Sequence, residues 1–250
     1  MKRGLIALTV VAVALRVAAQ AQSPTMGECP IFPEDNAWNT DISEFPVDPN
    51  SDAIIAAINE DGDEYLHADF GEDPDYGIPF VVVDGTQPDV PITFVEYGDE
   101  SDPGPYPVPD DAPVEAGNDA HVIVVDSGDC VLYEMYHAEY NGEGWDAGSG
   151  AVFDFTSNDL RPETWTSADA AGLPIFPGLA RYDEVAAGEI NHVLRFTVGE
   201  TQRAYIHPAL HWASSNTDTN LPPMGMRFRL RANYDISEFT GMSRTILEAL

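Results

Sequence analysis

Four side chains of this sequence are candidates for moving a proton in a reaction. His192, His211 and Tyr205 all lie between residues 192 and 211, and imidazole and phenol groups are common general acids and bases. Asp154 stands in the stretch VFDFT, between apolar neighbours that raise the pKa of a carboxyl group when they bury it. Each of these residues also fits an ordinary structural or solvent-exposed position. Acid–base chemistry therefore depends on whether the fold brings them together.

Five further side chains could hold a polymeric substrate. Arg195, Arg227 and Arg229 carry guanidinium groups, which pair with carboxylates through two parallel hydrogen bonds. Trp165 and Trp212 offer flat rings on which a sugar can stack. In a groove for a uronic-acid polysaccharide, arginine would neutralise the sugar carboxylate while a His or Tyr removes the adjacent proton. The alternative is that these arginines pair with the protein's own carboxylates.

The stretch GMRFRLRANYD, residues 225–235, alternates apolar and basic residues. A period of two predicts a strand with one apolar face and one face of guanidinium groups. The apolar face would consist of Met226, Phe228 and Leu230, and the charged face of Arg227, Arg229 and Arg231. Neighbouring groups on such a face are about 7 Å apart, so they need carboxylates, aromatic rings or an anionic ligand opposite them.

The sequence also allows a metal site, because carboxylates lie close to histidines. Asp119 and His121 share one face of a predicted strand. Together with His192 or His211 they could bind zinc or manganese, because these ions accept carboxylate and imidazole ligands. No spacing in the sequence fixes such a set of ligands, so the identity of any metal stays unknown.

The composition excludes several kinds of catalysis. No lysine follows residue 21, which excludes Schiff-base chemistry, Ser–Lys dyads and P-loops. The motifs HExxH, CxxC and GxSxG are absent. The acidic loops at 59–65 and 70–77 suit calcium, but neither has the EF-hand spacing, so a solvated acidic loop is the simpler interpretation. No cofactor is predicted, while calcium or a transition metal stays open.

Charge is distributed unevenly along the chain. Residues 22–160 contain 33 acidic residues and neither Lys nor Arg, whereas residues 161–250 contain 10 acidic residues and 8 arginines. The formal net charge is −32. So acidic a surface favours a halophilic source, because the short Debye length of concentrated salt weakens self-repulsion; a calcium-rich extracellular setting is the alternative. With no broad basic surface, neither nucleic acid nor an anionic membrane is an expected partner.

The first 21 residues are typical of a secretory signal peptide. Two basic residues precede an apolar run, and the residues AQA at 19–21 form a cleavage site of the A-x-A type. An uncleaved anchor is the alternative. In a secreted, extracellular protein, the two cysteines Cys29 and Cys130 predict a disulfide, with two free buried thiols as the alternative.

Strands would position most of these side chains. Strands are predicted at 78–84, 90–97, 120–126, 130–140, 151–156, 191–198, 202–210 and 226–235, the first two as one hairpin. Helices are predicted at 51–60, 166–174 and 243–250. The proline-rich stretch 98–118 should be an extended arm with too few strands on either side to close a separate core. We therefore expect residues 22–250 to form a single mainly β domain, a sandwich or barrel-like fold with a few short helices.

Four long motifs carry a resemblance to a known group of proteins. They are CPIFPEDNAWNTDIS (29–43), DESDPGPYPVP (99–109), the stretch from GSGAVFDFTS to LRFTV (148–198), and LPPMGMRFRLRANYDIS (221–237). In these motifs the chain resembles a family of secreted bacterial proteins with no assigned activity. The resemblance implies a secreted, self-contained domain and no catalytic residues. It also implies members that continue past residue 250, so a truncated C-terminus is an expectation.

Two functions of different classes follow from these observations. The first is a secreted carbohydrate-active enzyme, a hydrolase or lyase that acts on an extracellular and possibly acidic polysaccharide. The second is a non-catalytic extracellular binding or structural module, in which the aromatic and arginine side chains serve recognition or stability. The two differ in whether a histidine stands in an open cleft within hydrogen-bond reach of a carboxylate or tyrosine.

Overall fold

The structure is a computed structural model, and it describes residues 23–59 and 77–250. The predicted signal peptide at 1–21 lies outside the described residues. The two acidic loops considered for calcium also lie outside them, apart from residues 59 and 77. Both predictions stay predictions.

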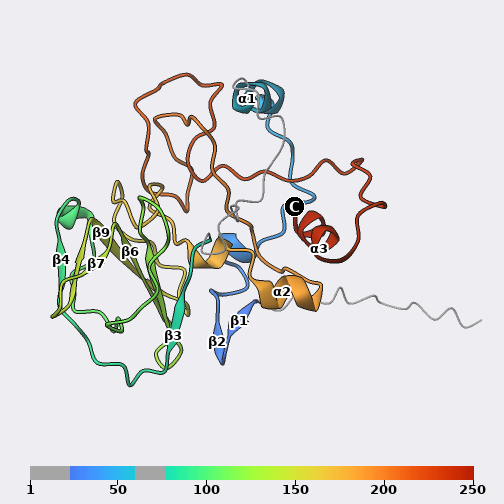
Figure 1. The fold of residues 1–250 in the computed structure, drawn as a ribbon. Helices are drawn as coiled ribbons and strands as arrows, with labels where there is room; N and C mark the ends of the chain where they lie inside the picture. Colours follow the sequence, from blue (N-terminus) through green and yellow to red (C-terminus); the bar gives the residue numbers. More distant parts are fainter. Residues whose placement is uncertain (1–22, 60–76) are drawn as a thin grey trace, which may run out of the picture.

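The largest sheet of the described residues has four strands (Figure 1). In spatial order they are β3 (Val81–Val83), β5 (Val122–Asp126), β6 (Val131–Tyr136) and β9 (Ser149–Asp154). β5, β6 and β9 pair antiparallel, and β3 pairs parallel with β5. All of β5 is buried, as expected for a strand covered on both faces. The last three strands confirm the predictions at 120–126, 130–140 and 151–156.

A three-stranded sheet packs against the first. Its order is β4 (Ile92–Phe94), β8 (Trp145–Ala147) and β7 (Glu139–Tyr140), and β4 pairs parallel with β8. The predicted hairpin of 78–84 and 90–97 is therefore wrong. Each of its strands pairs with a later strand that carries buried side chains, because this buries more apolar surface than a pair of two edge strands would. A separate two-stranded sheet joins β1 (Thr25–Met26) and β2 (Cys29–Pro30).

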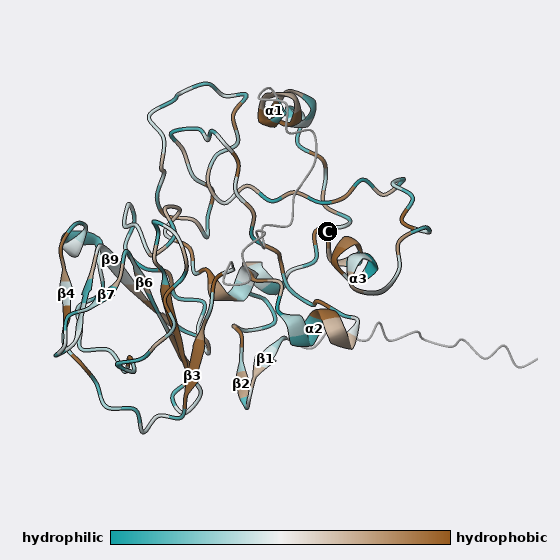
Figure 2. Ribbon diagram, viewed as in Figure 1, coloured by the Kyte–Doolittle hydropathy of each residue, from teal (hydrophilic) through white to brown (hydrophobic). Residues whose placement is uncertain are grey.

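The four-stranded sheet has a hydrophobic core on each face. Val122 and Val124 of β5 lie in one core, and Ile123 and Val125 lie in the other, as the alternation of side chains along a strand requires. The first core is completed by Tyr106, Val108, Trp145 and Ala147, and the second by Ile31, Trp38, Phe155, Ile175 and Phe176. The apolar character of β3 is plain in Figure 2. This arrangement confirms the mainly β class, and the sheets do not close into a barrel.

Three α-helices and three 3-10 turns occur among the described residues. They are α1 (Ser51–Ile58), α2 (Tyr182–Ala187), α3 (Gly241–Ala249), η1 (Ala37–Asn39), η2 (Gly98–Glu100) and η3 (Phe176–Gly178). α1 and α3 confirm two predicted helices, and α2 was not predicted. The helix predicted at 166–174 is wrong. The Ser167 hydroxyl, expected to cap it, accepts from the Asp169 amide at 2.9 Å and donates to the Leu173 carbonyl at 2.6 Å, which forms turns.

The arginine-bearing part of the chain, residues 161–250, is built differently. Residues 155–250, all of which the structure describes, contain no β-strand. The strands predicted at 191–198, 202–210 and 226–235 are therefore wrong, and an isolated bridge between Tyr205 and Met224 is the pairing that remains. The amides of these segments donate to carbonyls of several different loops instead of to the carbonyls of one neighbouring strand.

The predicted disulfide between Cys29 and Cys130 is present. It connects β2 to the residue before β6, across 101 residues of sequence. Among the described residues, no helix has the length and apolar character needed to cross a membrane.

Candidate functional site

Three aromatic side chains of the arginine-bearing part form a row at the surface. The rings of Tyr205 and Trp212 are nearly parallel, with an interplanar angle of 7° and centroids 5.9 Å apart. The rings of His211 and Trp212 make an angle of 10°, with centroids 5.5 Å apart. All three side chains are half-exposed. This aromatic row combines three of the nine residues that the sequence predicted for catalysis or substrate binding.

Polar and charged side chains border the aromatic row. The Tyr205 hydroxyl donates to Oε2 of Glu163 at 2.7 Å, and Nε2 of His207 donates to Oε1 of the same carboxylate at 2.8 Å. The guanidinium carbon of Arg203 lies 5.6 Å from the centroid of the Trp212 ring, within the range of a cation–π contact. Glu163, His207 and Arg203 are all exposed. The row thus combines stacked, half-exposed aromatic rings with hydrogen-bonding groups at its rim.

The backbone behind the row is anchored in the protein. Ala209 and Leu210, between the ring-bearing residues, are almost fully buried. The amides of Leu210 and His211 both donate to the carbonyl of Ala171, at 2.9 and 3.1 Å. The Ile206 amide donates to Met224 at 2.8 Å. These contacts fix both ends of the segment and hold the rings in place before any ligand arrives.

Two backbone features close to the row have unusual geometry. Thr164 has φ of 68°, a left-handed conformation that costs a non-glycine residue roughly 1–3 kcal/mol. Its amide donates to the Leu210 carbonyl at 2.9 Å, which places the neighbouring Glu163 against Tyr205. Gly225 has φ of 78°, and a Cβ there would lie 2.7 Å from that of Ala209. Only glycine fits at this approach.

The pKa values of the rim residues bear on the chemistry. The hydrogen bond from Tyr205 lowers the pKa of Glu163 below its usual value, and His207 lowers it further. The same hydrogen bond raises the pKa of the Tyr205 hydroxyl. A carboxyl group held ionised is a poor general acid, and a phenol with a raised pKa is a poor general base. In this state the rim is suited to accepting and donating hydrogen bonds.

The comparisons with known proteins identified no relative of this chain. No family model, no curated protein and no solved structure matches this chain. The resemblance carried by the four sequence motifs therefore stays a prediction, and function has to be argued from the site.

His192 lies apart from the aromatic row, in a buried charged group. Its side chain has no exposed surface, and its Nε2 is 3.1 Å from Oε2 of Glu184. The Arg181 guanidinium bonds to the other oxygen of Glu184. Nε and Nη1 of Arg181 are buried without a hydrogen-bond partner among the described residues, while its guanidinium lies over the Phe176 ring at 5.1 Å. Because His192 is enclosed, we leave it out of the proposed site.

Three other candidates also have local partners. The carboxylate of Asp154, at the end of β9, accepts from the amide and the hydroxyl of Thr156, at 2.7 and 2.6 Å. Nη2 of Arg195 donates to Asp169 at 2.7 Å. Trp165 is half-exposed, and the Arg161 guanidinium covers its ring at 5.6 Å. None of these contacts joins them to the row.

Arg227 and Arg229 bind the N-terminal segment. Their guanidinium groups donate to the carbonyls of Thr40 and Ile42, on either side of Asp41. The pKa of the Asp41 carboxyl is lowered mainly by hydrogen bonds from Ser43, with smaller contributions from the two arginines. Their hydrogen-bond partners are thus backbone carbonyls, and the basic stretch serves to hold two loops together.

Two buried ionisable side chains, Glu134 and His121, lie on or next to strands of the main sheet. Glu134 is fully buried on β6, and its carboxylate accepts from the amides of Ile175 and Phe176 at 2.8–2.9 Å. Burial raises its pKa to about 7, against the opposing effect of these hydrogen bonds. Nδ1 of His121 contacts Glu115, and Nε2 donates to the Ala168 carbonyl at 3.0 Å. Burial lowers the pKa of His121, but Glu115 raises it by more.

The described residues form no cluster of ligands that would support the predicted metal site. Residues 23–59 and 77–250 contain no group of three or more His, Cys, Asp and Glu placed to hold an ion. His121 bonds to Glu115, and it does not share a ligand set with Asp119.

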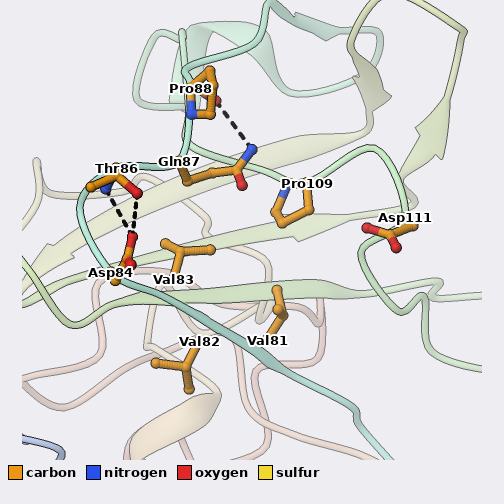
Figure 3. Close-up of a pocket in the computed structure, with 9 residues that line it drawn as sticks. All are labelled: Val81, Val82, Val83, Asp84, Thr86, Gln87, Pro88, Pro109 and Asp111. Atoms are coloured by element: carbon orange, nitrogen blue, oxygen red, sulfur yellow. Dashed lines mark hydrogen bonds between the residues drawn. The ribbon is translucent and has the colours of Figure 1, made fainter.

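A surface depression lies elsewhere, at the edge of β3. It has a volume of about 590 Å³ and is open to solvent. Figure 3 shows the three valines of β3 together with Pro109 and Asp111, and the turn after the strand, whose Thr86 bonds to Asp84. It contains no candidate catalytic residue and no histidine.

Sequence reasoning missed the rim of the aromatic row. A signal for two of its members was present, since Arg203, Tyr205 and His207 alternate with the period of an extended segment. Glu163 gave no signal, because it lies 42 residues from Tyr205 in the sequence and only the fold brings them together.

Proposed function

We propose that this protein is an extracellular carbohydrate-binding module, and that the aromatic row is the surface on which a polysaccharide docks. The observation that supports this most is the set of nearly parallel, half-exposed rings of Tyr205, Trp212 and His211. A sugar ring has apolar C–H faces and a polar edge. A flat aromatic surface bordered by hydrogen-bonding groups complements both.

The rim residues can supply the polar contacts. The Glu163 carboxylate can accept from sugar hydroxyls, in addition to the bonds it receives from Tyr205 and His207. Nδ1 of His211 donates to the Ala170 carbonyl at 2.8 Å, which leaves Nε2 of its neutral ring as an acceptor. Because the rings are already held by their own packing, little side-chain entropy is lost on binding.

Binding is favoured over catalysis by the charge states at the rim. An acid–base pair needs one group near neutral pKa, whereas the contacts at Glu163 and Tyr205 move their pKa values away from that range. The row residues are half-exposed and the rim residues are exposed, and a site without enclosure gives little exclusion of water.

The test is Trp212→Ala in a binding assay. We would measure affinity electrophoresis in gels that contain xylan, dextran, soluble cellulose oligomers or polygalacturonate, in concentrated salt, and then calorimetry with the polymer that retards the protein most. We expect Trp212→Ala to weaken binding by about tenfold or more, because a stacked aromatic contact contributes roughly 0.5–1.5 kcal/mol beyond its buried area.

Tyr182→Ala is the matched control. Tyr182 on α2 is 77% exposed and belongs to no part of the row, so its removal should leave binding unchanged. Equal loss in both variants, or retention of full affinity by Trp212→Ala, would contradict the proposal.

A second candidate function is an enzyme, a hydrolase or lyase, that acts at the same surface. It is favoured by the direct bonds of Glu163 to both Tyr205 and His207, which place three acid–base groups together. If it is correct, the protein releases reducing ends or unsaturated products that absorb in the ultraviolet. His207→Ala should then abolish turnover while binding persists. No product from any polymer that binds the protein would exclude this candidate.

We also propose that the protein is secreted and works in concentrated salt. The Cys29–Cys130 disulfide is compatible with an extracellular location, and the net charge of −32 suits such a medium. Detection of the mature chain beginning near residue 22 in culture medium would test secretion.

A further inference from the structure

We infer that the polysaccharide bound at the aromatic row is acidic, and that Arg203 pairs with its anionic group. This inference rests on the proposed function. It names the ligand class, which the row alone leaves open, because aromatic rings stack equally well on neutral and acidic sugars.

Arg203 differs from most other arginines of the protein because its guanidinium makes no hydrogen bond or ion pair within residues 23–59 and 77–250. Four arginines pair with a carboxylate, and two donate to backbone carbonyls. The first group is Arg161, Arg181, Arg195 and Arg244, and the second is Arg227 and Arg229. The guanidinium groups of Arg203 and Arg231 make no hydrogen bond or ion pair with the described residues. Of these two, Arg203 alone contacts the aromatic row.

The position of Arg203 suits an anion carried by a stacked sugar. Its guanidinium lies over the Trp212 ring, so a sugar in contact with Trp212 would bring its substituents close to it. The cation–π contact orients the guanidinium without using its N–H donors. These donors are then available for two parallel hydrogen bonds to a carboxylate or a sulfate ester.

The charge around the row permits an anionic ligand despite the acidity of the protein. Residues 161–250 have 10 acidic residues against 8 arginines, while the large excess of carboxylates lies in residues 22–160. Long-range repulsion by that excess is screened within about 3 Å at 1 M salt. A direct guanidinium–anion contact is screened much less, because its partners exclude water and ions. Affinity for an acidic polymer should therefore persist in concentrated salt.

The experiment compares one backbone with and without charge. We would titrate the protein by calorimetry with polygalacturonate oligomers, with the same oligomers as methyl esters, and with dextran sulfate beside neutral dextran, all in 1 M salt (about the 3 Å Debye regime). We expect up to about fivefold tighter binding of an acidic polymer than of its neutral counterpart, since an ion pair between exposed groups contributes roughly 0.2–1 kcal/mol. Preference for carboxylate or for sulfate identifies the anion.

Arg203→Gln should remove this preference. We expect it to weaken binding of the acidic polymer by up to about fivefold and to leave the neutral polymer unaffected. Arg231→Gln, a matched change at an exposed arginine outside the row, should change neither. Thermal unfolding monitored by circular dichroism confirms that both variants fold, as expected for exposed side chains.

The outcomes separate this inference from the proposed function. Equal binding of acidic and neutral polymers that is still lost in Trp212→Ala would overturn the inference and keep the proposed function. Equal weakening of both polymers by Arg203→Gln would also overturn it, since Arg203 would then act on the row alone. Failure of the wild-type protein to bind any polymer would contradict the proposed function itself.

Discussion

The acidic part of the chain, residues 22–160, and the arginine-bearing part, residues 161–250, are held in shape by different interactions. The nine strands that the described residues form all lie in the acidic part. There, backbone ladders satisfy the peptide groups, and apolar side chains fill a core on each face of the main sheet. The arginine-bearing part consists of loops with two helices and a 3-10 turn. Its backbone groups bond locally or to other loops. Three of its arginines, Arg161, Arg227 and Arg229, connect those loops to the acidic part.

Arg161 illustrates how an arginine replaces a strand contact. It is 9% exposed, and its Nε donates to Asp102 at 2.7 Å, while Nη2 donates to the Glu100 carbonyl at 3.0 Å. Nη1 donates to the Thr166 carbonyl. One planar group with five N–H donors can satisfy several carbonyls at once. This explains why residues without a ladder carry every arginine of the predicted mature chain.

This difference between the two parts predicts that a substitution that destabilises the acidic part also unfolds the arginine-bearing part. Replacement of Cys29 and Cys130 by serine opens a covalent link across 101 residues, and loss of a loop of that size lowers the free energy of unfolding by about 4 to 5 kcal/mol. Urea denaturation would give this value. Hydrogen exchange should show lost protection in both parts, because the second part packs on the sheet of the first. Normal protection in residues 161–250 would contradict this dependence.

Substitution of an arginine that connects the two parts should destabilise mainly residues 161–250. Arg161→Met removes the ion pair with Asp102, which keeps the Val152 amide as a donor, and the donors to the carbonyls of Glu100 and Thr166. Loss of one partner of a buried ion pair costs about 3 to 5 kcal/mol, and we expect the lower end because Asp102 is partly exposed. We expect lower unfolding free energy in urea, with hydrogen exchange accelerated most in residues 161–250 and least in β5 and β6.

The control for this variant is Arg244→Ala. Arg244 forms an exposed pair with Glu248 one helical turn away, at 2.7 Å, and such pairs contribute about 0.3–0.5 kcal/mol. A cost for Arg161→Met no larger than that of Arg244→Ala would show that the arginine contacts do not hold the second part.

The contact between the two parts at Glu134 should make stability depend on pH. Its pKa is about 7 in the folded protein and 4.5 as the reference value, so folding takes up a proton between these pH values. The free energy of unfolding should fall as pH rises from about 4.5 to about 7, by on the order of 3 kcal/mol. The raised pKa of His121 acts in the same direction, since the stability it adds below pH 6.5 is lost as pH rises through its folded-state value.

Urea denaturation at pH 5, 6, 7 and 8 in constant salt measures how steeply the free energy of unfolding changes with pH. The two pKa values of Glu134 set this pH range. Glu134→Gln should have a smaller slope, because an amide does not titrate, and at pH 5, where Glu134 is protonated, its stability should be close to that of the wild type. Glu44→Gln, at an exposed position, should keep the wild-type slope. A slope unchanged in Glu134→Gln would assign the pH dependence to other groups.

The sequence patterns predicted strand pairing correctly where the two strands lie close together along the chain. β5 and β6 form a hairpin with partners from Val122↔Met135 to Asp126↔Val131, and the two apolar runs with the short turn between them predicted this pair. The same period-two pattern at 226–235 predicted a strand that did not form. Phe228 does pack against Phe196, with ring centroids 5.2 Å apart, but the apolar and basic residues at 226–230 are all half-buried, so the apolar pattern reports a side-chain contact. It does not report whether another segment lies alongside to accept the backbone hydrogen bonds.

The sequence by itself determined the mainly β class, the disulfide pair, helices α1 and α3 and the one-sided distribution of arginine. These follow from composition, periodicity and cysteine count, which act locally or leave one pairing possible. It also placed Tyr205, His211 and Trp212 among the candidates. Only the tertiary structure decided that these three rings stack, that Glu163 joins them and that His192 is buried. Those outcomes depend on contacts across tens of residues, and the pattern of one segment carries no information about which distant segment will meet it.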